Sequence, residues 1–116
     1  MKRLALALAI AIPAMPAFAA DPAWHGRWAI DPIACTTEGD TAETAPLYAR
    51  ATSLRWFVAD CQVRKVSKAG SGVRIEARCG SEGTTKTIEV LLEPKGDRLG
   101  VVWDGSRVKD MRRCAP

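Results

Sequence analysis

The chain has 116 residues, of which 47% are hydrophobic and 26% are charged, and its formal net charge at pH 7 is +4. This length allows one small domain, which buries a modest share of its surface. Two of the basic residues, Lys2 and Arg3, belong to the first segment, and without them fifteen basic residues face thirteen acidic ones, a net charge of +2. Nucleic-acid binding needs a clustered basic stripe, so we predict no nucleic-acid partner.

The first nineteen residues have the layout of a secretory signal peptide. Lys2 and Arg3 precede an apolar run over residues 4–12, and Ala17-Phe18-Ala19 supplies the small residues of a cleavage site. The apolar run is shorter than the roughly 20 residues that cross a bilayer. We therefore expect residues 1–19 to be removed, leaving one β domain over residues 20–116. The expected product is a monomer without a membrane span, in a bacterial periplasm or secreted.

The first predicted strand covers residues 24–30, with Trp28 facing inward and Trp24 freer to reach solvent. His25 is the only histidine, and we interpret it as a surface side chain on the polar face of this strand. One histidine without a Cys-x-x-Cys pair does not make a standard zinc site, and no serine has a G-x-S-x-G setting. We therefore predict no catalytic residue, no metal and no cofactor.

The segment 31–46 follows as a 16-residue connection, and loops of this length are uncommon unless they are functional or disordered. It carries Asp31, Glu38, Asp40 and Glu43, and it contains no Lys or Arg. Several carboxylates favour a calcium ion, although their spacing matches no EF-hand loop. The alternative is that this acidic loop pairs with the basic residues near the C-terminus.

From residue 47 onward the sequence predicts short strands separated by turns. Residues 73–79 alternate apolar and charged side chains, as a half-buried strand does. Other strands are predicted over residues 47–51, 54–58, 61–67, 87–93, 99–103 and after the Asp104-Gly105 turn. Because no segment keeps a helical period, we expect an all-β fold. It would be a small antiparallel meander, closed or nearly closed into a barrel of about 7–8 strands.

Symmetric pairing about each turn predicts the strand register. The turns at 80–83, 94–97 and 104–105 pair Ile75 with Ile88, Val90 with Val101, and Val101 with Val108. A one-residue slip would turn every core side chain outward. A hairpin centred on Gly70 would point Lys65 inward, so we expect a β-bulge near residues 64–66 that turns Lys65 out and returns Val66 to the core.

The four cysteines are typical of a disulfide framework in a small exported domain. The hairpin centred on Gly70 places Cys61 directly opposite Cys79, at a separation that a disulfide accepts. That pair leaves Cys35 with Cys114. This second bridge would join the end of the first strand to the end of the last, as expected if the meander curls into a barrel.

Most apolar side chains are assigned to the core, including Trp28, Trp56 and Trp103. Leu91 and Val102 fall on the outward face, with Gly100 predicted opposite Leu91. They are either isolated surface side chains or part of a small patch that docks a partner. The candidate partner surface consists of five residues: Trp24, Asp40, Glu43, Leu91 and Val102.

Four short motifs carry a resemblance to a family. They are Gly26-Arg27-Trp28 followed by Cys35, the hairpin of Cys61 and Cys79, the turn Cys79-Gly80-Ser81-Glu82-Gly83, and Arg113-Cys114. In these motifs the chain resembles a group of small exported bacterial four-cysteine β proteins of uncharacterised function. In architecture alone it is similar to periplasmic lysozyme-inhibitor barrels, but the inhibitory loop motif of that group is absent. Architecture by itself does not imply function.

These observations favour a non-enzymatic periplasmic or secreted binding module that recognises a protein or an envelope component, and inhibitor-like action is one form of this. One alternative is a lipocalin-like carrier of a small apolar ligand, with tryptophans lining its cavity. Another is a purely structural or unknown role in the envelope.

Overall fold

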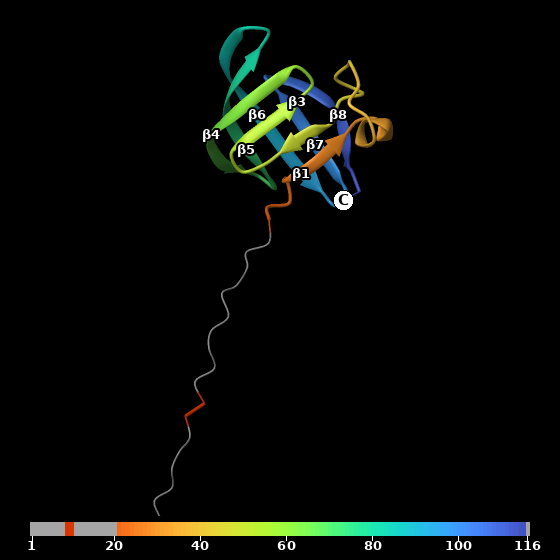
Figure 1. Cartoon of the computed structure of the whole chain (residues 1–116). Coiled ribbons are helices and arrows are strands. Elements are labelled where there is room, and N and C mark those ends of the chain that lie inside the picture. Colours follow the sequence, from red (N-terminus) through yellow and green to blue (C-terminus); the bar gives the residue numbers. More distant parts are fainter. Residues whose placement is uncertain (1–8, 11–20, 116) are drawn as a thin grey trace, which may run out of the picture.

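The computed structural model describes residues 9–10 and 21–115, so almost all of the predicted signal peptide of residues 1–19 lies outside the described residues. Eight antiparallel strands form a closed barrel in chain order, which confirms the predicted fold class (Figure 1). The strands are β1 (Gly26–Ala29), β2 (Leu47–Ala49), β3 (Ser53–Trp56), β4 (Ala59–Ala69), β5 (Gly72–Ser81), β6 (Thr84–Lys95), β7 (Arg98–Trp103) and β8 (Ser106–Arg113). A short 3-10 helix, η1 (Pro32–Cys35), follows β1. No helix in the described ranges is long and apolar enough to cross a membrane.

The two ends of the barrel carry different connections. One end, which we call the acidic end, carries the connections 30–46, 57–58, 82–83 and 104–105. The other, which we call the terminal end, carries residues 21–25 and 114–115 and the turns 50–52, 70–71 and 96–97. In Figure 1 the acidic end lies at the top and the terminal end at the bottom.

Two of the predicted registers are wrong by two residues. Ile75 pairs with Val90 instead of Ile88, and Val90 pairs with Trp103 instead of Val101. The chain turns at Glu82-Gly83 and again at Gly96-Asp97, not at the centres of the longer turns that were predicted. Because the strand period is two, this shift leaves every side chain on its predicted face. The register at Asp104-Gly105 is confirmed, with Val101 opposite Val108.

The predicted β-bulge is confirmed in β4, where the register with β5 shifts between Val63 and Lys65. Lys65 is exposed as expected, but Val66 is 43% exposed although it pairs with the buried Ile75. The expected return of Val66 to the core is therefore wrong. The reason is that β3 pairs with β4 only up to Gln62, so β4 continues past the end of its neighbour.

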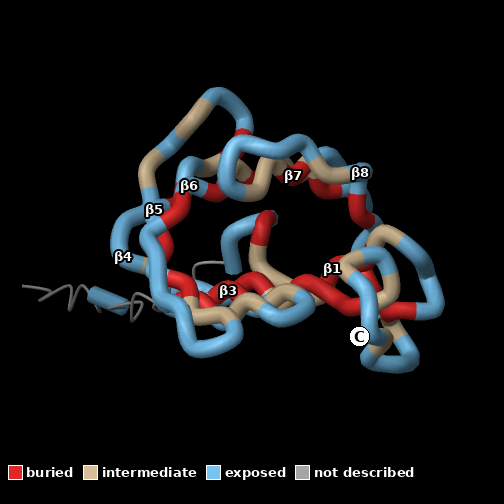
Figure 2. The backbone as a smooth tube through the Cα atoms, turned by 90° about the horizontal axis from the view of Figure 1, so that it is seen from above, coloured by how far each residue is buried: buried red, intermediate tan, exposed pale blue. Residues whose placement is uncertain are grey.

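The barrel interior is filled by side chains, and the buried residues line the inside of the ring in Figure 2. The large apolar side chains among them that are at most 1% exposed are Trp28, Leu47, Leu54, Ile75, Val90, Leu92, Leu99, Val101 and Met111. Toward the acidic end, Trp56 and Trp103 pack edge to face with ring centroids 5.2 Å apart. The assignment of Trp28, Trp56 and Trp103 to the core side of the strands is confirmed.

Both predicted disulfides are present, so no cysteine in the described residues is free. Cys61–Cys79 lies within the barrel wall and belongs to the main core. Cys35–Cys114 attaches η1 to the outside of the seam between β1 and β8, where Ala29 and Ala34 are also buried. Cys35–Cys114 therefore fastens η1 to the barrel, whereas Cys61–Cys79 adds a covalent link inside the long β4–β5 ladder.

Candidate functional site

The predicted partner surface is not brought together as one surface. Trp24 is only 6% exposed and packs in the core, so its assignment to the surface is wrong. The His25 amide donates to the Pro22 carbonyl at 2.9 Å, and Trp28 Nε1 donates to the Trp24 carbonyl at 3.1 Å. This turn at the terminal end directs the Trp24 side chain into the barrel, which a strand period cannot predict.

Leu91 and Val102 pair directly across β6 and β7, so the expected pairing of Leu91 with Gly100 is wrong, and Gly100 faces Glu93. Both apolar side chains point outward, as predicted, and both are half-buried. They lie on the barrel wall, whereas Asp40 and Glu43 lie on the long connection at the acidic end.

The connections of the acidic end carry charge of one sign. Within 30–46, 57–58, 82–83 and 104–105 there are six carboxylate residues and no Lys or Arg; the acids are Asp31, Glu38, Asp40, Glu43, Glu82 and Asp104. In addition to the Cys35–Cys114 bridge, two side-chain hydrogen bonds attach the later part of the long connection to the barrel. Trp56 Nε1 donates to the Ala42 carbonyl at 3.0 Å, and the Tyr48 hydroxyl donates to Glu38 Oε1 at 3.2 Å. These acids therefore belong to a loop that is attached to the barrel wall.

The β3–β4 turn at this end is apolar and exposed. Phe57 and Val58 form it, and they are 43% and 49% exposed. Phe57 has φ 54°, a left-handed conformation that is a genuine outlier for a bulky residue. Phe57 also lines a shallow depression together with Glu38 and Arg55, so the apolar turn adjoins the acidic loop.

Sequence reasoning missed this turn, because residues 54–58 were predicted as one strand. The structure ends β3 at Trp56 and places Val58 in the turn. Two-residue hairpin turns usually contain Gly, Asn or Asp, and Phe57-Val58 contains none of them. No local signal in the sequence could have identified this turn.

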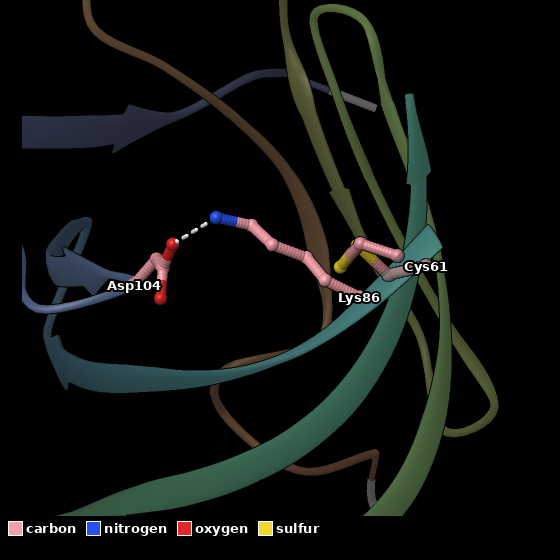
Figure 3. A network of polar contacts seen from close by, with 4 residues as sticks. Cys61, Lys86 and Asp104 are labelled. Atoms are coloured by element: carbon pink, nitrogen blue, oxygen red, sulfur yellow. Dashed lines mark hydrogen bonds and ion pairs between the residues drawn. A yellow bond between two sulfur atoms is a disulfide. The ribbon is translucent and has the colours of Figure 1, made fainter. Parts of the chain in front are cut away.

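One of the six carboxylates is neutralised. Lys86 lies opposite Cys79 in the β5–β6 ladder and so shares its inward face. Its Nζ reaches Asp104 Oδ2 at 2.7 Å on the β7–β8 turn, across the mouth of the barrel (Figure 3). The other five acids make no ion pair with any residue that the structure describes.

The motifs from the two ends of the chain meet at the terminal end. The Arg113 guanidinium lies 4.2 Å from the centroid of the Trp28 ring. Its two terminal nitrogens donate to the carbonyls of His25 and Ala23 at 2.9 and 2.7 Å. Gly26-x-Trp28 and Arg113-Cys114 therefore have a structural explanation: they close the β1–β8 seam.

His25 is half-buried, so its interpretation as a surface side chain is wrong in part. Its Nε2 is buried without a hydrogen-bond partner in the described part of the chain, and its ring meets Trp24 edge to face at 4.1 Å between centroids. No recorded hydrogen bond joins it to a serine or a carboxylate among the described residues. The arrangement does not form a nucleophile–base pair.

The four acids of 31–46 do not converge on a common point. Among residues 9–10 and 21–115, no three His, Cys, Asp or Glu side chains are grouped so that they could hold a metal ion. The alternative, pairing of this loop with the basic C-terminal residues, is wrong as well, because no ion pair joins them in the described chain.

Comparisons with protein-family models, with curated proteins and with solved structures give no significant match for this chain. The resemblance to small exported four-cysteine β proteins therefore stays a prediction.

Proposed function

We propose that this protein is a non-enzymatic binding module of the periplasm or the extracellular space, and that it recognises a basic protein through its acidic end. The signal-peptide layout, the two disulfides and the barrel without a long apolar helix support this compartment. The surface consists of the exposed turn Phe57-Val58 and the acidic connection that adjoins it.

The conformation of Phe57 is the observation that carries the proposal. A left-handed backbone costs a non-glycine residue about 1–2 kcal/mol, and an aromatic residue that stays 43% exposed recovers only part of the free energy of its burial. Strain of this kind concentrates at functional sites. Apolar contact by Phe57 and Val58 would supply affinity, while the surrounding carboxylates would favour a cationic partner and speed its approach.

The filled interior favours this function over that of a lipocalin-like carrier. A carrier barrel holds its ligand inside the wall. Here the centre of the barrel is occupied by side chains such as Trp28 and Met111, which are fully buried. Trp56 and Trp103 pack against each other at the acidic end instead of lining an open cavity there.

Replacement of Phe57 by Asn separates binding from folding. Asn adopts the left-handed conformation readily, so Phe57→Asn keeps the turn and removes the aromatic ring. Proteins captured from envelope extract on the oxidised barrel would be identified, purified and titrated against each variant. We expect a basic partner whose affinity falls about tenfold or more with Phe57→Asn and falls further as salt is raised.

Val66→Asn is the matched control, because Val66 is 43% exposed, as Phe57 is, and lies on β4 outside the acidic end. This variant should retain most of the affinity. Phe57→Asn should also unfold at the same or a higher urea concentration than the parent. A captured partner that binds Phe57→Asn as tightly as the parent, or capture of acidic proteins alone, would refute the proposal.

A further inference from the structure

A concave cleft lies at the terminal end, and Phe57 and Val58 are not part of its lining. It has a volume of about 860 Å³ and lies between the start of β1, the end of β2 and the residues that follow β8. Three arginines, Arg27, Arg50 and Arg113, line it together with His25. The volume is within the range of small-molecule sites.

None of the three guanidinium groups forms an ion pair within the described residues. None lies within 4.0 Å of a carboxylate of any described residue, although Asp21 lines the same cleft. Like charges gathered in one concave site repel one another, and a low-dielectric wall strengthens the effect. With three guanidinium groups and one carboxylate in its lining, the cleft carries a net positive charge that an added anion would reduce.

Two of these guanidinium groups are held in place by neutral acceptors. Arg27 Nη2 donates to the carbonyl of Cys35, and Arg113 donates to two carbonyls of the segment before β1. These bonds orient the planar groups without cancelling their charge. A guanidinium that is already oriented loses little freedom when it binds a carboxylate or a phosphate.

The side chain of the third arginine, Arg50, is free to change its conformation. Arg50 follows β2 and is exposed, and its side chain makes no hydrogen bond within the described residues. Ala51 is exposed beside it on the wall of the cleft and adds a small apolar contact surface. Two fixed cations and one mobile cation form a site that can close on an anionic group.

We propose that this arginine cleft binds a small molecule that carries a phosphate or carboxylate group, with Arg50 completing the site. Arg27 and Arg113 provide positive charge on guanidinium groups that are already oriented, and Arg50 forms the bidentate hydrogen bonds to the anion. The oxidised protein, labelled with ¹⁵N, would be titrated with inorganic phosphate in one arm and with citrate in another. Sodium chloride at equal ionic strength provides the reference.

Saturable shifts of the Arg50 Nε–H signal and of the Gly26 and Arg27 amides are expected with phosphate, with citrate or with both, and the arm that saturates identifies the anion class. Arg50→Gln should weaken binding at least about tenfold, as expected for loss of a charged hydrogen bond. Arg98→Gln is the control, because Arg98 is exposed and lies outside the cleft; it should not change the affinity.

Arg50→Lys provides a second test, since it keeps the charge and loses the planar pair of donors. Its affinity should lie between those of the parent and Arg50→Gln. Shifts that follow the chloride reference in both arms, or equal affinity in the parent and Arg50→Gln, would overturn the assignment. The Phe57→Asn protein should bind the anion as tightly as the parent does. A failure of the anion site can therefore be distinguished from a failure of the proposed protein-binding surface.

Discussion

Arg113 occupies the space that a side chain at position 26 would need: a Cβ added to Gly26 would lie 2.6 Å from Arg113 Nη1. Gly26 also has φ +136°, which side chains rarely allow. Because Gly26 has no side chain, Arg113 of β8 can cover Trp28. Arg113 also reaches the carbonyls of residues 23 and 25, some ninety positions earlier in the chain. The closure of the barrel therefore depends on a glycine.

Gly26→Ala should destabilise the protein by about 2–3 kcal/mol, because it combines backbone strain with displacement of the Arg113 side chain. The free energy of unfolding in urea, with the disulfides intact, measures this loss. Gly80→Ala is the control. Its added Cβ would meet nothing closer than 4.0 Å, so it should be neutral or slightly stabilising. Equal losses in the two variants would contradict the steric explanation.

Arg113→Lys should lower the free energy of unfolding by about 1 kcal/mol although the charge is retained. One ammonium group does not reproduce a planar fork that donates to two carbonyls while it stacks on an indole ring. Urea denaturation of the variant tests this. The neighbouring Arg112 is exposed, and its side chain makes no hydrogen bond to another described residue, so Arg112→Lys should match the parent. A loss of similar size in both variants would mean that the fork geometry is unimportant.

The two disulfides should differ in their contributions. Cys35–Cys114 closes a separation of 79 residues and Cys61–Cys79 one of 18. Loop-closure entropy then predicts losses of about 4.5 and about 3 kcal/mol when each pair is replaced by alanine. Thermal or urea unfolding of the two double variants gives the order. If the variant lacking Cys61–Cys79 were the less stable one, local packing would outweigh chain entropy.

The ion pair of Lys86 with Asp104 should contribute little to stability despite its 2.7 Å separation, because the two side chains are 66% and 44% exposed. Lys86→Met should change the free energy of unfolding by less than about 1 kcal/mol, and any loss should shrink at high salt. Lys109→Met, at an exposed lysine without an ion pair in the described chain, is the comparison. A loss above about 2 kcal/mol that persists in salt would assign the pair a structural role.

The sequence by itself determined the features that depend on local periodicity. Alternation of side chains in β5 and β6 identified the inward face correctly even where the register was wrong by two residues. Asp104-Gly105 predicted its turn because both residues accept a positive φ. The Cys61–Cys79 bridge followed from one hairpin, and the Cys35–Cys114 bridge followed because only that pair remained.

Tertiary structure decided the candidate sites. Trp24 is buried because the chain turns under the barrel, and Phe57-Val58 forms a turn without turn-forming residues because the neighbouring strands hold it there. The arginine cleft gathers residues 27, 50 and 113 from strands far apart in the chain. Local pattern determines which way a side chain points along its own strand. Which distant side chains it meets depends on how the barrel closes, and closure is a property of the whole chain.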